Sequence, residues 1–120
     1  MSKEIWKPVV GFEGLYQVSN LGRIMSFHKT RGRILKPYQG GYRKGYLVIT
    51  LVRDGMKKKE LVHTLVLEAF VCKRPIGYQC NHINSNKQDN RLENLEWVTP
   101  KENSEHVIKN LGKRRDGESR

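Results

Sequence analysis

Asn81-His82-Ile83-Asn84 opens the most informative part of this sequence, and Asn94-Leu95-Glu96-Trp97-Val98-Thr99-Pro100-Lys101-Glu102-Asn103 closes it. We expect a short strand at about 78–81, a second at about 95–98, and a helix from residue 100. Thr99 suits the N-cap of that helix and Pro100 its first position. The loop between Gly77 and Glu93 is too polar for us to expect it to be buried, so side-chain hydrogen bonds or a ligand must order it.

The first half of the sequence reads as short strands separated by turns. Asp54-Gly55 is typical of a hairpin turn, and Tyr46–Val52 is rich in β-branched residues. Apolar residues at helical spacing then predict a helix over about 61–71 that packs on the sheet. The other predicted strands are 14–19, 23–27 and 33–36.

Length and charge narrow the class of protein. A chain of 120 residues suits one compact domain. Its net charge is +11, and residues 1–60 hold thirteen Lys/Arg against four Asp/Glu. Such a surplus favours a polyanionic partner, and nucleic acid is the polyanion we expect. No apolar run is long enough for a membrane span or a signal peptide, so we expect a soluble, intracellular protein.

The asparagines and His82 have a chemistry in common. Amide oxygens bind hard divalent cations, and a neutral histidine beside such a cation can take a proton from water. These groups are the minimum for metal-assisted hydrolysis of a phosphodiester. Cys72 and Cys80 are expected to be reduced thiols, and a zinc site made from them with His63 and His82 fits no common spacing.

The same residues resemble the HNH endonuclease family of phage and intron-associated homing enzymes. The resemblance rests on the segment 62–70, on Asn81-His82-Ile83-Asn84, and on Asn90 to Thr99 with Asn103. Residues 4–24 are similar to the NUMOD4 module that precedes the nuclease part in many such proteins. The implied fold class is α+β: a small N-terminal antiparallel β module with a helix, followed by a ββα-metal (HNH) motif. The implied regions are 1–60 for DNA binding, 61–111 for the nuclease, and 112–120 as a disordered basic tail.

The resemblance also implies roles for individual residues. His82 stands at the general base, Asn81 and Asn103 at the two metal ligands, and Asn94 at the loop-ordering asparagine. Mg²⁺ is the expected ion, with Mn²⁺ as the second candidate, and double-stranded DNA is the expected partner. Many relatives carry Asp or His where this chain has Asn81, so the cation would depend on the DNA phosphate for negative charge. The candidate DNA contacts are Arg23, Lys29, Arg31, Arg33, Lys57, Lys58, Lys59 and Lys87, with His106 as a candidate phosphate contact.

Several alternatives stay open at this point. The chain could be a nucleic-acid-binding protein without cleavage, whose amide-rich loop is ordered only by its own hydrogen bonds. His63 is expected to be a packing residue and His28 to be exposed. A monomer is favoured, with one active site that nicks one strand, in a bacterial cytoplasm or a phage-infected cell.

Overall fold

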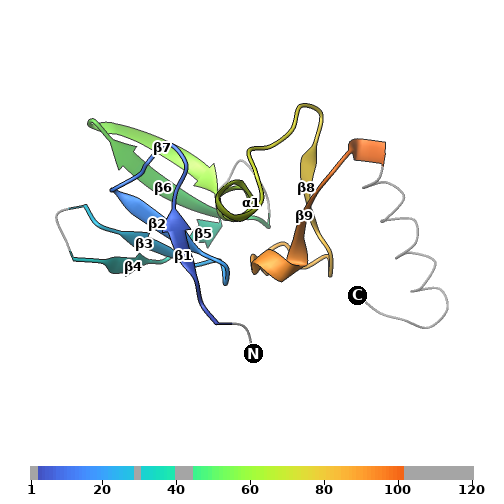
Figure 1. Ribbon diagram of the computed structural model, residues 1–120, viewed down its shortest axis with the longest axis horizontal. Coiled ribbons are helices and arrows are strands. Elements are labelled where there is room, and N and C mark those ends of the chain that lie inside the picture. Colours follow the sequence, from blue (N-terminus) through green and yellow to red (C-terminus); the bar gives the residue numbers. More distant parts are fainter. Residues whose placement is uncertain (1–2, 29–30, 40–44, 102–120) are drawn as a thin grey trace.

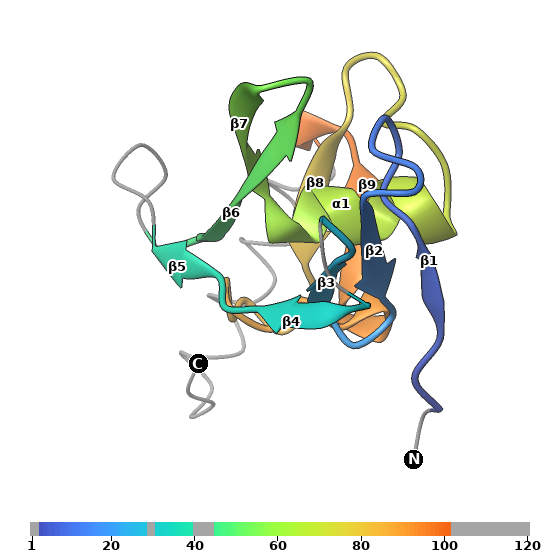
Figure 2. The ribbon, with the colours of Figure 1, turned by 90° about the vertical axis from the view of Figure 1, so that its left-hand side faces the viewer.

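The helix α1 (Val62–Phe70) stands between two antiparallel sheets and a β-hairpin (Figure 1). This computed structural model describes residues 3–28, 31–39 and 45–101. The predicted α+β class is confirmed, and the observed helix lies within the predicted range of 61–71. Figure 2 shows α1 running behind the first sheet, with the hairpin on its far side.

The first sheet has the order β1-β2-β3-β4, and each strand is antiparallel to the next. The turn between β2 and β3 is closed by Ser19, whose Oγ accepts hydrogen bonds from the backbone N–H groups of Leu21 and Arg23, each at 3.1 Å. Three of these strands were predicted, whereas β1 was missed because an edge strand ending in Pro8 has no alternating pattern. The strands are β1 (Trp6–Pro8), β2 (Tyr16–Ser19), β3 (Ile24–Ser26) and β4 (Arg33–Leu35).

The second sheet consists of β5 (Tyr38–Gln39), β6 (Leu47–Arg53) and β7 (Met56–Leu61). Asp54 and Gly55 both have positive φ, 53° and 76°, which is the backbone of a two-residue type I′ hairpin. The predicted turn is therefore confirmed. The strand β7 is mostly exposed and highly charged, and its structure comes from pairing with β6 rather than from its own hydrophobic pattern.

The hairpin of the second half is formed by β8 (Gln79–His82) and β9 (Leu95–Val98), with the 3-10 helix η1 (Leu92–Asn94) before β9. Both strands were predicted, β8 with a shift of one residue. Pro100 and Lys101 are helical, as predicted. The remainder of the predicted C-terminal helix and the predicted tail lie outside the described residues.

One hydrophobic core joins the two halves of the chain. Val18 and Leu51 from the sheets pack with Val66 and Leu67 of α1, and Leu95 of β9 belongs to the same cluster. The helix α1 contacts strands of both sheets as well as β8 and β9. The predicted division at residue 60 therefore crosses a continuous core, and the functional boundaries of the regions stay a prediction.

His28 is a correction to the sequence analysis. It was expected to be exposed, but it is half-buried, with Nε2 2.8 Å from the backbone oxygen of Val52. Its ring also lies against Tyr16, with 5.4 Å between ring centroids. These contacts with β6 and β2 bring together segments that are far apart in the sequence, and no local pattern signals them.

Candidate active site

Asn81 and Glu96 face each other across the β8–β9 hairpin. They are paired in the strand register, so their side chains lie on the same face. Asn81 Nδ2 donates a hydrogen bond to Glu96 Oε2 at 2.8 Å. Asn81 is 6% exposed, while Glu96 is exposed. This arrangement places a buried amide and an accessible carboxylate together at the predicted metal position.

His82 is held by a hydrogen bond to Asn90. The ring is 6% exposed, and Nε2 lies 2.8 Å from Asn90 Oδ1. The amide oxygen of Asn90 faces the ring and can only accept, which favours the tautomer with the proton on Nε2 and the lone pair of the neutral ring on Nδ1. Burial lowers the pKa of His82, and the positive charge of Lys87 lowers it further, against opposing contributions from Asn90 and Asp89. The imidazole is therefore neutral near pH 7.

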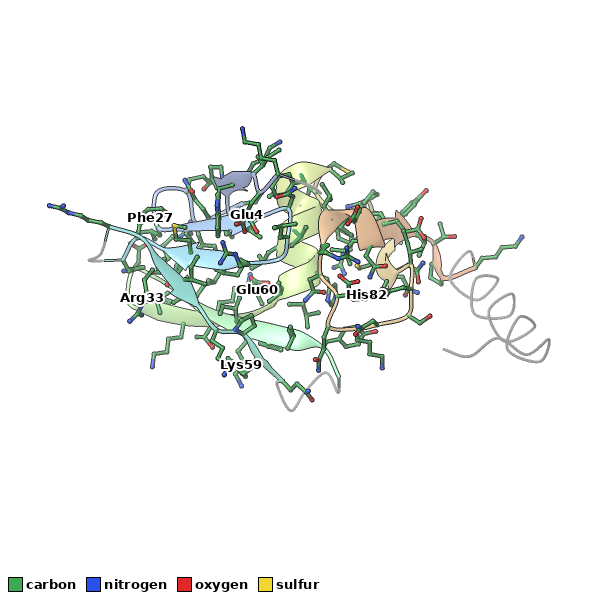
Figure 3. All side chains as sticks on the ribbon, turned by 90° about the horizontal axis from the view of Figure 1, so that it is seen from below. Glu4, Phe27, Arg33, Lys59, Glu60 and His82 are labelled. Carbon is green, nitrogen blue, oxygen red and sulfur yellow. The ribbon has the colours of Figure 1, made fainter. Side chains whose placement is uncertain are left out.

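Aromatic rings surround His82 on the side of α1. The ring of His63 meets it edge-on at 4.9 Å between centroids, and the ring of Tyr46 lies at 5.8 Å. Lys87 places its ammonium group 5.0 Å from the centre of the Tyr46 ring. His63 is 5% exposed, in accord with the predicted packing role. Figure 3 shows His82 on the hairpin side of α1, away from Arg33 and Lys59 on the sheets.

Asn94 links the two ends of the loop between β8 and β9. Its Oδ1 accepts from the Asn84 backbone N–H at 2.9 Å, and its Nδ2 donates to Asn84 Oδ1 and to the Asp89 backbone oxygen, both at 2.9 Å. Its own backbone oxygen accepts from Ile83 N–H at 2.8 Å. The loop is thus ordered by side-chain hydrogen bonds, as the sequence indicated.

The expectation that this segment is too polar to be buried was wrong for its key residues. Asn81, His82 and Asn90 are each 5% or 6% exposed, and so is Asn94 just after the segment. Hydrogen bonds to one another, to Glu96 and to the loop backbone offset most of the cost of removing these groups from water, although Nδ2 of Asn90 is buried without a hydrogen-bond partner among the described residues.

The β2–β3 turn of the first sheet supports this loop from outside. The backbone oxygen of Asn20 accepts from Leu92 N–H at 2.7 Å. Gly22 has a φ of +87°, and a Cβ built on it would lie 2.9 Å from the backbone oxygen of Asn90. The residue that holds His82 is therefore in contact with the N-terminal sheet.

The structure describes one of the two predicted metal ligands. Asn81 lies beside His82 on β8, Asn103 lies outside the described residues, and their role as metal ligands stays a prediction. The donors near Asn81 are amide and carboxylate oxygens, which suit Mg²⁺ or Mn²⁺ better than zinc. Sequence reasoning missed Glu96 as a neighbour of Asn81, and also missed the role of Asn90. Paired end to end, the predicted strands 78–81 and 95–98 place Leu95 opposite Asn81, and only the observed register, shifted by one residue, brings Glu96 to that position.

The two cysteines, Cys72 and Cys80, do not form a metal site within the described part of the chain. Within residues 3–28, 31–39 and 45–101, no three His, Cys, Asp or Glu side chains are grouped to hold a metal ion. Cys72 is exposed, and burial raises the pKa of Cys80 to about 12. The zinc site considered from His63, Cys72, Cys80 and His82 is therefore not formed.

The predicted DNA contacts lie in different surroundings. Lys87 lies over the ring of Tyr46, which is next to His82. Arg31 and Arg33 are exposed, just before and at the start of β4. Arg23 is already engaged, since its Nε donates to Glu4 Oε2 at 2.8 Å and its guanidinium lies over the ring of Trp6. Two other predicted contacts, Lys29 and His106, lie outside the described residues.

The three lysines of β7 are exposed, but they do not share one face. Lys57 and Lys59 lie opposite Val52 and Thr50 in the register, whereas Lys58 lies opposite Leu51. Alternation along the strand therefore separates Lys58 from the other two. Lys58 Nζ also pairs with Glu60 Oε2 at 3.1 Å. Lys57 and Lys59 are the better candidates for phosphate contact.

Comparisons with known proteins agree with this geometry. Residues 4–52 match the NUMOD4 motif, and residues 60–105 match the HNH endonuclease family. The chain is 43% identical over 111 residues to an uncharacterized HNH endonuclease of Acanthamoeba polyphaga mimivirus, which covers 89% of this chain and 27% of that protein. It is 39% identical over 103 residues to the DNA endonuclease I-HmuI of Bacillus phage SP01, which covers 86% of this chain and 57% of that protein.

A solved structure of an HNH endonuclease is also similar to this chain. It describes DNA binding and cleavage by the HNH homing endonuclease I-HmuI, and it matches with a TM-score of 0.79 and 36% sequence identity. The match covers 88% of this chain and 59% of that one, so this chain spans little more than half of its structural relative. Among the described residues, no helix is long and apolar enough to cross a membrane. With both motifs in order along one fold, the chain belongs to the HNH endonuclease family and carries a NUMOD4 motif before its HNH region.

Proposed function

We propose that this chain is a metal-dependent DNA endonuclease of the homing type, which hydrolyses a phosphodiester bond and leaves a 5′-phosphate. The observation that carries the proposal is the state of His82, which is buried, neutral and fixed through Nε2, one residue from Asn81. A general base needs a free lone pair held in one direction, and Nδ1 of this tautomer supplies it.

The roles proposed for the residues are those that the resemblance to the HNH family implies. His82 Nδ1 would take a proton from the attacking water, while Asn81 and Asn103 would hold the cation. A bound Mg²⁺ or Mn²⁺ supplies positive charge for the phosphate and the leaving 3′-oxygen. Asn81 and His82 are consecutive residues of β8, and an in-line displacement would need the cation and the base on opposite sides of the phosphate.

The partner in this proposal is double-stranded DNA. The +9 surplus of residues 1–60 gives that region the electrostatic attraction that phosphate binding requires. Lys57 and Lys59 on the sheet and Lys87 beside the site would contact the backbone. We infer a monomer in the bacterial cytoplasm or a phage-infected cell, and a single active site would nick one strand.

A second candidate function has one observation in its favour. The loop around Asn94 is ordered by its own hydrogen bonds, so it needs no metal ion to hold its shape. A DNA-binding protein without cleavage would also show such a loop.

Plasmid nicking separates the two candidates. The parent should nick supercoiled DNA with Mg²⁺ and stop when EDTA is added. His82→Ala should lower the rate by about 10²- to 10⁴-fold, the usual contribution of a general base, while DNA affinity stays nearly unchanged. A folded His82→Ala protein that nicks at the parent rate would remove His82 from the mechanism. A parent that binds DNA and never cuts would establish the second candidate.

A further inference from the structure

Glu96 is the one carboxylate in contact with the proposed metal ligand Asn81 among the described residues. It stands directly opposite Asn81 in the hairpin register and accepts a hydrogen bond from Asn81 Nδ2 at 2.8 Å. Glu96 itself is exposed. Its charge therefore lies at the boundary between the buried amide and the solvent.

The hydrogen bond determines which end of the amide faces outward. A carboxylate only accepts hydrogen bonds, so the atom of Asn81 that faces Glu96 must be the NH₂ group. The two ends of a planar amide point in different directions, and Oδ1 is thereby turned away from Glu96. An Asn81 without this partner could present either end to a cation, and only Oδ1 is a ligand.

The same hydrogen bond changes the strength of the ligand. Hydrogen bonds from a neutral donor to an ionised acceptor are stronger than neutral pairs, and they draw electron density toward the far end of the donor group. Carboxylates that accept from a ligand residue raise its basicity and fix its orientation. Asn81 with Glu96 behind it is therefore a better cation ligand than an isolated amide.

We propose that Glu96 is the positioning residue for Asn81, and that the pair does the work of the carboxylate ligand that many relatives carry. This inference rests on the proposed function and deepens it. It also modifies the expectation that the DNA phosphate is the main negative charge at the cation, because a fixed carboxylate of the protein lies one hydrogen bond away.

A purely structural explanation makes a different prediction. Facing side chains in a hairpin stabilise the pairing of the strands whether or not a metal binds. In that case, loss of Glu96 would lower the thermal stability and leave the metal affinity of the folded protein unchanged.

The test measures Mn²⁺ affinity of the full chain from the electron paramagnetic resonance signal of free Mn²⁺. Glu96→Ala should weaken Mn²⁺ binding by about 10- to 100-fold, the usual effect of removing such a partner of a ligand. Glu96→Gln keeps an acceptor oxygen and loses the charge, so its loss should be smaller. The matched control is Glu93→Gln, which removes the same charge from an exposed residue that pairs with Arg91, and it should bind Mn²⁺ like the parent.

A double-mutant cycle identifies the route of the effect. If Glu96 acts through the amide, Glu96→Ala should have no further effect on Mn²⁺ affinity when combined with Asn81→Ala. The side-chain amide protons of Asn81 provide a second measurement without metal: in the NMR spectrum they should shift upfield in Glu96→Ala as the hydrogen bond is lost.

The outcomes are distinct. Parent-like Mn²⁺ affinity in folded Glu96→Ala overturns the inference and leaves the proposed function intact. The inference is also overturned if Glu96→Ala weakens Mn²⁺ binding as much in the Asn81→Ala background as in the parent. Glu96 would then bind the cation directly. A parent that binds no Mn²⁺, with or without DNA, overturns the proposed function together with the pair. If Glu96→Ala fails to fold, Glu96→Gln carries the test, since its amide oxygen still accepts from Asn81.

Discussion

The basic sheets of the N-terminal half and the amide-rich hairpin of the C-terminal half are built in opposite ways. Arg33, Lys57 and Lys59 are exposed side chains on strands. Asn90 and Asn94 are buried, and each hydrogen bonds to a different part of the site. A charge acts over several ångströms whatever its side-chain conformation, whereas an amide acts only in one orientation. Substitutions should therefore have small, additive effects in the first region and large effects in the second.

Among the substitutions that leave His82 in place, Asn90→Ala should have the largest effect. It removes the acceptor that fixes the tautomer of His82, so we expect the single-turnover rate of DNA nicking to fall by about 10²-fold, part of the contribution of a general base. DNA affinity should change little. Asn86→Ala is the control, since exposed Asn86 lies in the same loop and its side-chain oxygen accepts from the backbone N–H of Gln88, away from His82. A rate close to that of the parent would mean that the hairpin tolerates substitution as well as the sheets do.

Asn94→Ala should have the next largest effect, on stability. It leaves the Asn84 N–H and the Asp89 carbonyl without their partner in a part-buried loop. We expect the free energy of unfolding to fall by about 1 to 3 kcal/mol, the cost of unsatisfied polar groups. Denaturant titration followed by tryptophan fluorescence measures it. Gln88→Ala, at an exposed position of the same loop, should leave the stability at the parent value.

Neutralising Lys57, Lys58 and Lys59 to Gln should weaken DNA binding without affecting the rate at saturating DNA. Each true phosphate contact contributes about 0.9 to the log–log dependence of affinity on salt. Because Lys58 faces away from Lys57 and Lys59 and pairs with Glu60, Lys58→Gln alone should leave the slope unchanged. Filter binding over a range of salt concentrations decides it, and a triple variant with the parent slope would show that β7 does not touch DNA.

The smallest effect should be a pH dependence of the loop. Hydrogen bonds from Arg91 are the main reason why the pKa of Asp89 is lowered from 3.8 to about 2. A lowered carboxyl pKa stabilises the folded state above pH 3.8, and this contribution is lost as the pH falls toward 2. The difference in unfolding free energy between the parent and Asp89→Asn should therefore be constant above pH 5 and shrink below pH 3.8. A difference that persists unchanged at pH 2 would contradict this assignment.

The sequence predicted the parts of this molecule whose information is local. The Asp54-Gly55 turn, the helix α1 and the strands β8 and β9 follow from turn chemistry and hydrophobic period, and each is observed. It did not predict β1 or the burial of His28, because both depend on contacts between distant segments. The site shows the same division. Asn81 and His82 stand out as a motif, whereas Glu96 and Asn90 gain their importance only from what they face.

Gly22 has a consequence for how such enzymes diversify. It lies in the N-terminal sheet, yet it has no room for a side chain, since a Cβ there would come within 2.9 Å of the Asn90 backbone oxygen. Recombination that joins a new recognition module to this nuclease region would therefore have to preserve a glycine at that turn. Otherwise the incoming module would push against Asn90, which hydrogen bonds to His82, the proposed general base. Under the proposed function, a change of DNA recognition and the retention of catalytic rate would then be constrained together by the absence of one Cβ atom.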